Sequence, residues 1–252
     1  MIDLTMGWAD QPVLDRVNLR LEEGERLVVV GPSGAGKSTI LRLLAGLLLP
    51  SSGELRLHGE PQRYLRLDQR HPPDVRLVFQ NPALLASLTV GENVGYLLYR
   101  FSRLGDGEIR ERVRRALKAV GLQGIEERLP GELSGGMQKR VSFARALIED
   151  PARVDGRVPL LLFDEPTAGL DPMACTRIED LIVTSTEVAQ ASSVVVSHVV
   201  STINRVAERV VLLYGGRLRW QGSADQFRSS DDPFVAQFRS GSLRGPMQPA
   251  EP

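Results

Sequence analysis

GPSGAGKST, residues 31–39, directly follows the apolar run at 27–30 and decides the fold. The stretch matches the phosphate-binding pattern G-x-x-x-x-G-K-[ST] at every position. The apolar run predicts a buried parallel strand, and residues 40–47 repeat apolar side chains at helical spacing. Residues 31–39 are therefore expected to form the loop between a strand and a helix, which is the context that a phosphate-binding loop requires.

Glycines and one lysine give this phosphate loop its chemistry. Gly31, Gly34 and Gly36 permit backbone conformations that other residues avoid, so that amide N–H groups can turn toward an anion at a helix N-terminus. Lys37 is expected to reach the β- and γ-phosphates of a nucleotide, and Ser38 to bind Mg²⁺. The same candidate site includes Ser33, Ala35 and Thr39. The alternative that the motif leaves open is a glycine-rich turn without a ligand.

Two carboxylates end the most apolar strand in the sequence. Asp164 and Glu165 follow the run at 160–163, and buried carboxylates are costly unless they hold a metal or a reacting water. Asp164 is expected to bind Mg²⁺ directly or through water, and Glu165 to polarise an attacking water. The alternative is a solvated loop start.

Polar residues follow two further predicted strands. The β-branched stretch at 193–196 leads to His198, and the stretch at 75–79 leads to Gln80. Open α/β sheets place ligand contacts at the carboxyl ends of their strands. Gln80 and His198 should therefore join Glu165 at one edge of the sheet, although a histidine there is usually only a polar cap.

A second glycine pair begins a predicted helix. Residues 131–136 read GELSGG, and Ser134 is a good N-cap for a helix that continues to about 148. Gly135 and Gly136 each weaken the first turn by ~1 kcal/mol relative to alanine, unless the backbone must approach another group closely. That group could be a second phosphate.

Composition narrows the possible functions. The 252 residues suffice for one large domain or two small ones, with an ordinary globular content of 42% hydrophobic and 25% charged residues. Lysine plus arginine equals aspartate plus glutamate at 31 each, so no net field favours nucleic acid or anionic lipid. No apolar stretch reaches the ~18 residues of a membrane span, and a membrane role is expected to come through a partner. The lone Cys175 fits a reducing compartment.

The remaining pattern predicts an alternating set of strands and helices. Trp8, upstream of the first predicted strand, could stack on an adenine ring, although a core or surface tryptophan is about as common. The other expectations are strands at 13–21 and 54–58, a loop at 61–74, helices at 89–101, 106–120 and from Pro172 to about 188, a hairpin at 210–221, a helical tail at 223–240 and a loosely ordered end from Gly241.

Together these pieces resemble the nucleotide-binding subunit of ATP-binding-cassette (ABC) proteins over nearly the whole chain. The matching motifs are GPSGAGKST for Walker A, Gln80 for the Q-loop, LSGGM at 133–137 for the signature, LLLFDEP at 160–166 for Walker B, GLD at 169–171 for the D-loop, His198 for the switch histidine and Trp8 for the adenine-stacking aromatic. The resemblance implies an α/β P-loop NTPase domain at 1–222, with a small antiparallel β-subdomain and a helical subdomain at about 85–150, followed by a C-terminal helical tail at 223–252.

The resemblance also implies a shared site. Two copies would sandwich two ATP molecules with Mg²⁺, and hydrolysis would reopen the dimer. Each site would take Lys37, Ser38, Gln80, Asp164, Glu165 and His198 from one copy and Ser134, Gly135 and Gly136 from the other, with Asp171 among the nucleotide-binding residues and with Gln80, Ser38 and Asp164 around the metal.

A narrower resemblance concerns the cargo. LSGGMQKR, with Met137 where the family more often has glutamine, TAGLDPMACTRIEDLI and the tail are similar to the ATPases of MCE-type lipid transporters, including the bacterial Mla system and the chloroplast lipid importer. This implies phospholipid or glycolipid transport, a homodimer, an integral membrane permease, an MCE-type substrate-binding protein, and a place on the cytoplasmic face of the inner or plasma membrane. The N-terminal residues lack transit-peptide features, which favours a bacterial, cyanobacterial-type member.

Two other functions stay open at this point. The same ATPase could serve another cargo, such as an amino acid or a metal. A soluble ABC protein of translation or DNA maintenance is disfavoured by the single cassette and the absence of a basic surplus, and nucleic acid is not expected as a partner.

Overall fold

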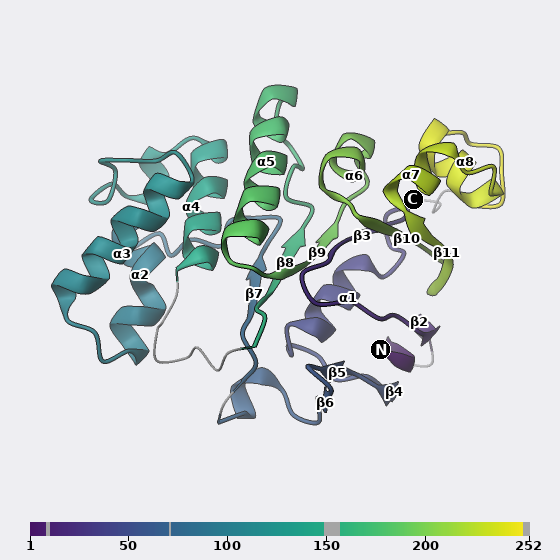
Figure 1. Cartoon of the computed structure of the whole chain (residues 1–252), viewed down its shortest axis with the longest axis horizontal. Helices are drawn as coiled ribbons and strands as arrows, with labels where there is room; N and C mark the ends of the chain where they lie inside the picture. Colours follow the sequence, from purple (N-terminus) through teal and green to yellow (C-terminus); the bar gives the residue numbers. More distant parts are fainter. Residues whose placement is uncertain (9–10, 71, 149–156, 249–252) are drawn as a thin grey trace.

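The computed structural model describes residues 1–8, 11–70, 72–148 and 157–248. Its centre is a six-stranded sheet in the order β11-β10-β3-β9-β8-β7 (Figure 1). Neighbouring strands run parallel except for β11, which pairs antiparallel with β10. The bounds are β3 (Arg26–Val30), β7 (Val75–Val78), β8 (Leu160–Asp164), β9 (Ser192–Val196), β10 (Arg209–Tyr214) and β11 (Arg217–Ser223).

Both faces of this sheet are buried. In β3, Val28 and Val30 belong to one core, while Leu27 and Val29 belong to the other. The first core includes residues of α5 (Pro172–Val188) and α6 (Val200–Val206), and the second includes residues of α1 (Lys37–Leu44). Burial on two faces explains why the parallel strands read as continuous apolar runs. Each fully buried aliphatic side chain stabilises the fold by roughly 1.5–3 kcal/mol.

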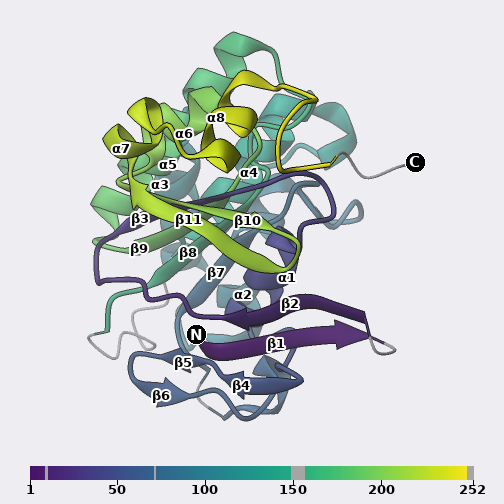
Figure 2. The same cartoon turned by 90° about the vertical axis from the view of Figure 1, so that its right-hand side faces the viewer.

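A small antiparallel sheet packs on the second core and confirms the predicted β-subdomain (Figure 2). Its order is β2-β1-β4, and a separate pair joins β5 to β6. The bounds are β1 (Ile2–Trp8), β2 (Gln11–Val17), β4 (Ser52–Glu54), β5 (Arg56–Leu57) and β6 (Glu60–Pro61).

Three expectations for this region need correction. The alternation predicted a strand at 13–21, but β2 ends at Val17. The strand expected at 54–58 is divided between β4 and β5, and the expected loop at 61–74 also holds a short 3-10 helix, η1 (Arg66–Asp68). The strand β1 was not predicted, because register shifts on both sides of Met6 break its alternation and Asp3 has φ 43°.

The helical part lies between β7 and β8 in the chain. It contains α2 (Val90–Phe101), α3 (Asp106–Ala119) and α4 (Gly135–Leu147), each as predicted to within a residue or two, and a short 3-10 helix, η2 (Pro130–Glu132), that was not predicted. A reciprocal capping box fixes the start of α2, since Thr89 Oγ1 accepts from the Glu92 amide and Glu92 accepts from the Thr89 amide. The predicted end of this part, near 150, lies outside the described residues.

The C-terminal tail differs from the single helix expected at 223–240. It forms α7 (Ala224–Ser229) and α8 (Pro233–Ser240), because Asp232 caps a new helix that has Pro233 in its first turn. The end after Gly241 is not loose as far as Gln248. The buried Gln237 donates to Met247 O at 2.7 Å and accepts from Met247 N at 2.7 Å. Residues 249–252 of the predicted tail lie outside the described residues.

Candidate functional site

The phosphate loop leaves β3 at the carboxyl edge of the sheet. A Cβ on Gly31 would lie 2.2 Å from Leu213 O, so the strand–loop junction admits only glycine without a shift. The Lys37 ammonium group is buried and donates to Gly31 O at 2.9 Å and Pro32 O at 3.0 Å. Burial lowers the pKa of Lys37, while the charges of Glu165 and Asp164 act in the opposite direction. The loop thus encloses a cation where the sequence predicts phosphate.

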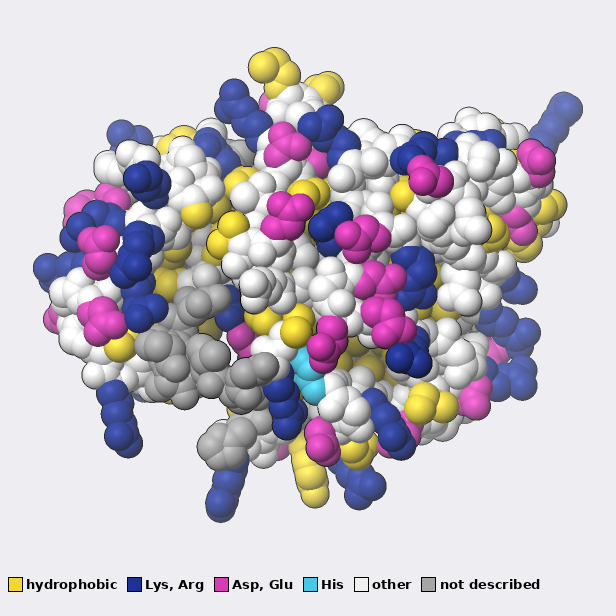
Figure 3. All heavy atoms as spheres, viewed as in Figure 1, with side chains coloured by type: hydrophobic (Ala, Val, Ile, Leu, Met, Phe, Trp, Pro, Cys, Tyr) yellow, Lys and Arg dark blue, Asp and Glu magenta, His cyan; other side chains and the backbone are white. Residues whose placement is uncertain are grey.

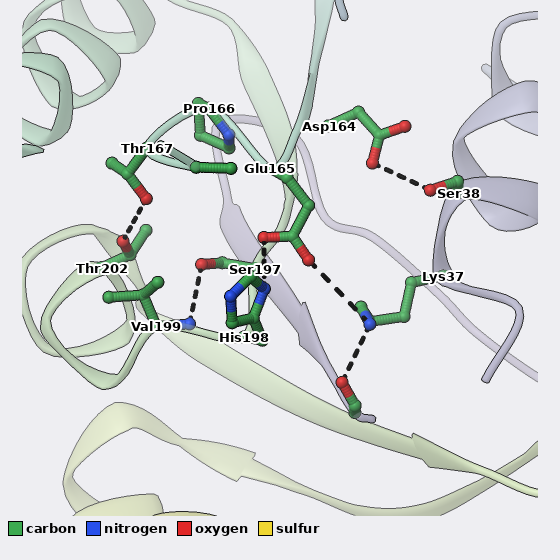
Figure 4. Close-up of polar contacts among 12 residues, drawn as sticks. Lys37, Ser38, Asp164, Glu165, Pro166, Thr167, Ser197, His198, Val199 and Thr202 are labelled. Carbon is green, nitrogen blue, oxygen red and sulfur yellow. Dashed lines mark hydrogen bonds and ion pairs between the residues drawn. The ribbon is translucent and has the colours of Figure 1, made fainter. Parts of the chain in front are cut away.

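Ser38 and Asp164 meet at the base of the site. Ser38 Oγ donates to Asp164 Oδ1 at 2.9 Å (Figure 4). Burial raises the pKa of Asp164, and the hydrogen bond from Ser38 partly opposes this shift. Within the described ranges no group of three or more His, Cys, Asp or Glu residues could hold a metal ion. The two oxygen donors therefore fit Mg²⁺ that takes its other ligands from water and phosphate oxygens, as this ion commonly does beside a nucleotide.

Glu165 stands in a strained backbone conformation. Its φ is 44°, which a non-glycine residue holds only at a cost of roughly 1–3 kcal/mol. Its amide donates to Val196 O at 3.0 Å, and this bond fixes the turn after β8 to β9. Observed strain of this kind concentrates at functional sites, and here it belongs to the residue predicted to act on water.

The Glu165 carboxylate lies between the side chains of Lys37 and His198 (Figure 4). Oε1 is 4.0 Å from Lys37 Nζ, and Oε2 is 2.8 Å from His198 Nδ1. Oε2 is buried, and within the described chain no group makes a hydrogen bond of good geometry to it, so the close histidine nitrogen is not aligned for a linear bond. This oxygen is suited to accept a hydrogen bond from a water molecule. The structure thus brings Lys37, Glu165 and His198 together as predicted.

A buried polar network, which the sequence analysis missed, holds the segments behind this carboxylate. Thr167 and Thr202 share a hydrogen bond between their hydroxyl groups at 3.3 Å. Glu179, 1% exposed on α5, accepts from Thr202 Oγ1 at 2.9 Å and from Ser201 Oγ at 3.0 Å. The network ties α6, which follows His198, to the segment that follows Glu165. Its only sequence signal is the place of Glu179 beside Ile178 on a helix with a buried face.

Lys139 on α4 is a second feature that the sequence analysis missed. It is 8% exposed, and its Nζ donates to Pro166 O at 3.1 Å and to Ala168 O at 2.5 Å. A signal was available, because Lys139 lies three and four residues before the buried Ser142 and Phe143 and therefore on the same face of the helix.

The predicted signature residues begin α4. Ser134 is exposed and caps the helix, since its Oγ accepts from the Met137 amide at 3.3 Å. A Cβ on Gly135 or Gly136 would meet no atom within 4 Å, so packing among the described residues does not require glycine at either position. The predicted N-cap is confirmed, and the two glycines have no explanation inside one chain.

Three other predicted residues have weaker structural support. Gln80 follows β7, which pairs with β8, so it reaches the expected edge of the sheet, but it is exposed and its role at a metal stays a prediction. Asp171 caps α5, accepting from the amides of Met173 and Ala174 at 3.0 Å, which gives this carboxylate a local role. Trp8 ends β1 and is 50% exposed, and its contact with adenine stays a prediction.

A groove adjoins this edge of the sheet. It has a volume of about 870 Å³ and lies between the helical part and the segment that leads into β7. Arg145 of α4 supports one wall by donating to Pro82 O at 2.9 Å and Ala83 O at 2.8 Å. Exposed apolar side chains that line the groove are Leu47, Phe79, Leu85, Tyr96 and Leu97.

The outer surface is mixed in charge. Figure 3 shows acidic and basic side chains interspersed over α5 and α6 on the face that it displays. Among the described helices, none has the length and apolar character needed to cross a membrane.

Comparison with known proteins agrees with this geometry. Residues 14–168 match the family described as ABC transporter. The chain is 45% identical to Protein TRIGALACTOSYLDIACYLGLYCEROL 3, chloroplastic, of Arabidopsis thaliana, over 98% of this chain and 74% of that protein. It is 34% identical to the intermembrane phospholipid transport system ATP-binding protein MlaF of Haemophilus influenzae, over 98% of this chain and 91% of that protein.

A solved structure extends the comparison to the fold. The dimeric post-hydrolysis state of the ATP-binding cassette MJ0796, bound to ADP and Pi, superimposes with a TM-score of 0.74 at 28% identity. The match covers 88% of this chain and 97% of that chain.

Proposed function

The chain belongs to the ABC transporter family of ATPases, and from this membership we propose that it energises the transport of phospholipid or glycolipid through a membrane permease. The assignment of a lipid cargo rests on sequence similarity over 98% of the chain, including the tail. One similar protein is named for a galactolipid, and another is a phospholipid transport ATPase. We further propose an MCE-type substrate-binding protein as a third component, and a position on the cytoplasmic face of the inner or plasma membrane through the permease.

The arrangement around Glu165 supports a division of labour in ATP hydrolysis. Lys37 and the amides of the phosphate loop would bind the β- and γ-phosphates, as their enclosed position suits. Glu165 Oε2 would accept a hydrogen bond from the attacking water and draw its proton, while the bond from the γ-phosphorus to the β–γ bridging oxygen breaks. His198 would hold the Glu165 carboxylate and approach the γ-phosphate.

Ser38 and Asp164 would hold the magnesium ion of the nucleotide. When bound, Mg²⁺ supplies charge neutralisation on the β- and γ-phosphate oxygens. The Ser38–Asp164 hydrogen bond keeps both oxygen donors at one place at the base of the phosphate loop. Gln80, exposed at the neighbouring strand end, would join this group at the metal.

The two unexplained glycines support a site shared between copies. Gly135 and Gly136 cost the first turn of α4 ~1 kcal/mol each, yet no atom of the described chain lies where their Cβ atoms would be. A group from outside the chain that approaches this turn closely would account for both glycines. We assign residues 134–136 of one copy to the phosphates that Lys37 of a second copy holds, and the dimeric state of the similar cassette agrees with this.

The groove beside β7 fits the permease. Its apolar lining and its arginines Arg66, Arg70 and Arg145 suit a cytoplasmic segment that has both apolar and acidic side chains. The groove also connects to Gln80 through Arg145, which binds the carbonyls of Pro82 and Ala83 just beyond it. A segment seated there would therefore be coupled to the nucleotide site.

Isolation of the intact complex tests this function. The tagged chain is purified from membranes in mild detergent, its partners and bound lipid are identified by mass spectrometry, and the complex is reconstituted in vesicles with labelled lipid. We expect a permease, an MCE-type protein and lipid movement that requires ATP and is lost in a complex with Glu165→Gln. Isolation of a permease with a soluble binding protein for an amino acid or metal would refute the proposed lipid cargo. Association with ribosomes or DNA would refute the proposed role in transport.

A further inference from the structure

Lys139 is a buried lysine that the mechanism above does not use. Its partners among the described residues are two backbone carbonyls, Pro166 O at 3.1 Å and Ala168 O at 2.5 Å. Burial lowers the pKa of Lys139, and the electrostatic effects of Cys175 and, to a smaller extent, of Glu165 oppose the shift. Burying an ammonium group is costly without strong partners. An apolar side chain would pack on the same face of α4 without the free-energy cost of burying a charge, so packing alone does not explain a lysine at this position.

The two ends of this contact belong to different parts of the proposed site. Lys139 lies one helical turn beyond Gly135 and Gly136 on α4. Its carbonyl partners follow Glu165 by one and three residues, and the Ala168 amide in turn donates to Glu165 O at 3.1 Å. One side chain therefore connects the signature turn at 134–136 to the segment that orients Glu165.

The segment after Glu165 is held from its other side as well. Cys175 Sγ lies 3.6 Å from both Thr167 O and Leu170 O, and Thr167 bonds to Thr202. Contacts with α5 and α6 hold this segment on one side. A shift of α4 would therefore move residues 166–168 relative to α5 and α6, because Lys139 bonds to their carbonyls.

We propose that Lys139 is a positioning residue that transmits closure of the signature turn to Glu165 of the same chain. The inference rests on the proposed dimer, in which residues 134–136 face the nucleotide of the second copy while Glu165 acts on the nucleotide of its own chain. Lys139 then links the two sites, and nucleotide at one site orients the base at the other. A misplacement of about 1 Å in a catalytic group can lower the rate about 100-fold, so a short link of this kind has a measurable effect.

The test compares Lys139→Met with Lys139→Arg, with Lys118→Met as the matched control on the exposed face of α3. Steady-state ATP hydrolysis, fluorescent-nucleotide affinity and thermal unfolding are measured on the full chain. For Lys139→Met we expect kcat to fall about 10- to 100-fold, ATP affinity to change less than about twofold, and the Hill coefficient for ATP to fall toward one. Lys139→Arg, which can still donate to both carbonyls, should restore part of kcat and the cooperativity.

A second measurement separates positioning from stability. In the Glu165→Gln background, Lys139→Met should still form the ATP-trapped dimer. The reason is that the proposed defect affects the orientation of residue 165 after the two copies have closed on ATP. If Lys139→Met does not fold, Lys139→Gln, which keeps N–H donors without the charge, takes its place. Unchanged kcat and cooperativity in a folded variant, or a loss of kcat that tracks the melting temperature and is not restored by arginine, would overturn the proposal. Failure of the unmodified chain to dimerise with ATP would instead refute the shared site on which the proposal rests.

Discussion

His198 Nδ1 lies 2.8 Å from Glu165 Oε2, and the register of two adjacent strands sets this contact. Asp164 at the end of β8 is paired with Val196 at the end of β9, and the Glu165 amide donates to Val196 O. The two side chains therefore leave neighbouring strands at the same level. The pair is a property of the backbone of the sheet, and substitution of either side chain should leave the other in place.

Replacement of the carboxylate tests the role of Glu165 directly. We expect Glu165→Gln to lower ATP turnover by about 10²–10⁴-fold, the usual contribution of a general base, while ATP binding is retained and a dimer accumulates. Phosphate release and size-exclusion chromatography with ATP measure the two effects. The control is Glu187→Gln, an exposed glutamate on α5. Hydrolysis at the original rate would remove Glu165 from the role of base.

A double-variant cycle tests whether His198 acts through Glu165. His198→Ala alone should lower kcat, whereas the same change in the Glu165→Gln background should cause little further loss, because groups that act as a unit are strongly non-additive. Single-turnover rates measure both steps. Independent, multiplicative losses would show that His198 serves the γ-phosphate without orienting the carboxylate.

Asp164→Asn should separate stability from activity. Burial raises the pKa of Asp164, so the folded chain holds the charged carboxylate at a cost that is fully present above the raised pKa and disappears as the pH falls below the unfolded value. The amide removes this cost and can still accept from Ser38. We expect the variant to melt at a higher temperature at neutral pH and to require more Mg²⁺ for hydrolysis. Calorimetry across pH checks the sign: a gain that grows on acidification would contradict it.

Gly136→Ala should stabilise the single chain and weaken the proposed ATP-dependent dimer. No atom lies within 4 Å of the added Cβ, and alanine favours a helix over glycine by ~0.5–1 kcal/mol. The melting temperature without nucleotide should therefore rise slightly, while ATP-dependent dimerisation and turnover fall. Gly107→Ala on α3, whose Cβ also meets nothing, is the matched control. Normal dimerisation of Gly136→Ala, measured by light scattering, would remove the signature turn from the interface.

Gln237→Ala tests the packing of the C-terminal segment. The change leaves Met247 N and Met247 O without their side-chain partner, and each buried unpaired group costs ~1–3 kcal/mol. At about 2–4 °C per kcal/mol, a clear fall in melting temperature is expected. Gln221→Ala on the exposed side of β11 should have little effect. Equal melting of the two variants would show that Met247 does not pack against α8.

The sequence predicted the features that depend on residues close together in the chain. The runs at 27–30 and 160–163 are apolar on both faces, so they identify central strands, and polar residues mark where those strands end. The grouping of Glu165 with His198 followed from that pattern. The bonds of Lys139 and Gln237 could not be predicted, because each joins a side chain to backbone carbonyls whose positions depend on the tertiary fold. The strand β1 was missed because its bulges remove the period of two.

The insertion of the helical part between β7 and β8 has an evolutionary consequence. These two strands are parallel neighbours in the sheet, so the chain leaves at the carboxyl edge after Val78 and re-enters at the amino edge with Leu160, which is paired with Val75. Sequence drift or exchange within the inserted helices can then reshape the groove that we propose for the permease, while the strands that precede Lys37, Glu165 and His198 keep their register. The same ATP-hydrolysing core can in this way adapt to different transport partners through changes confined to a single contiguous segment of the gene.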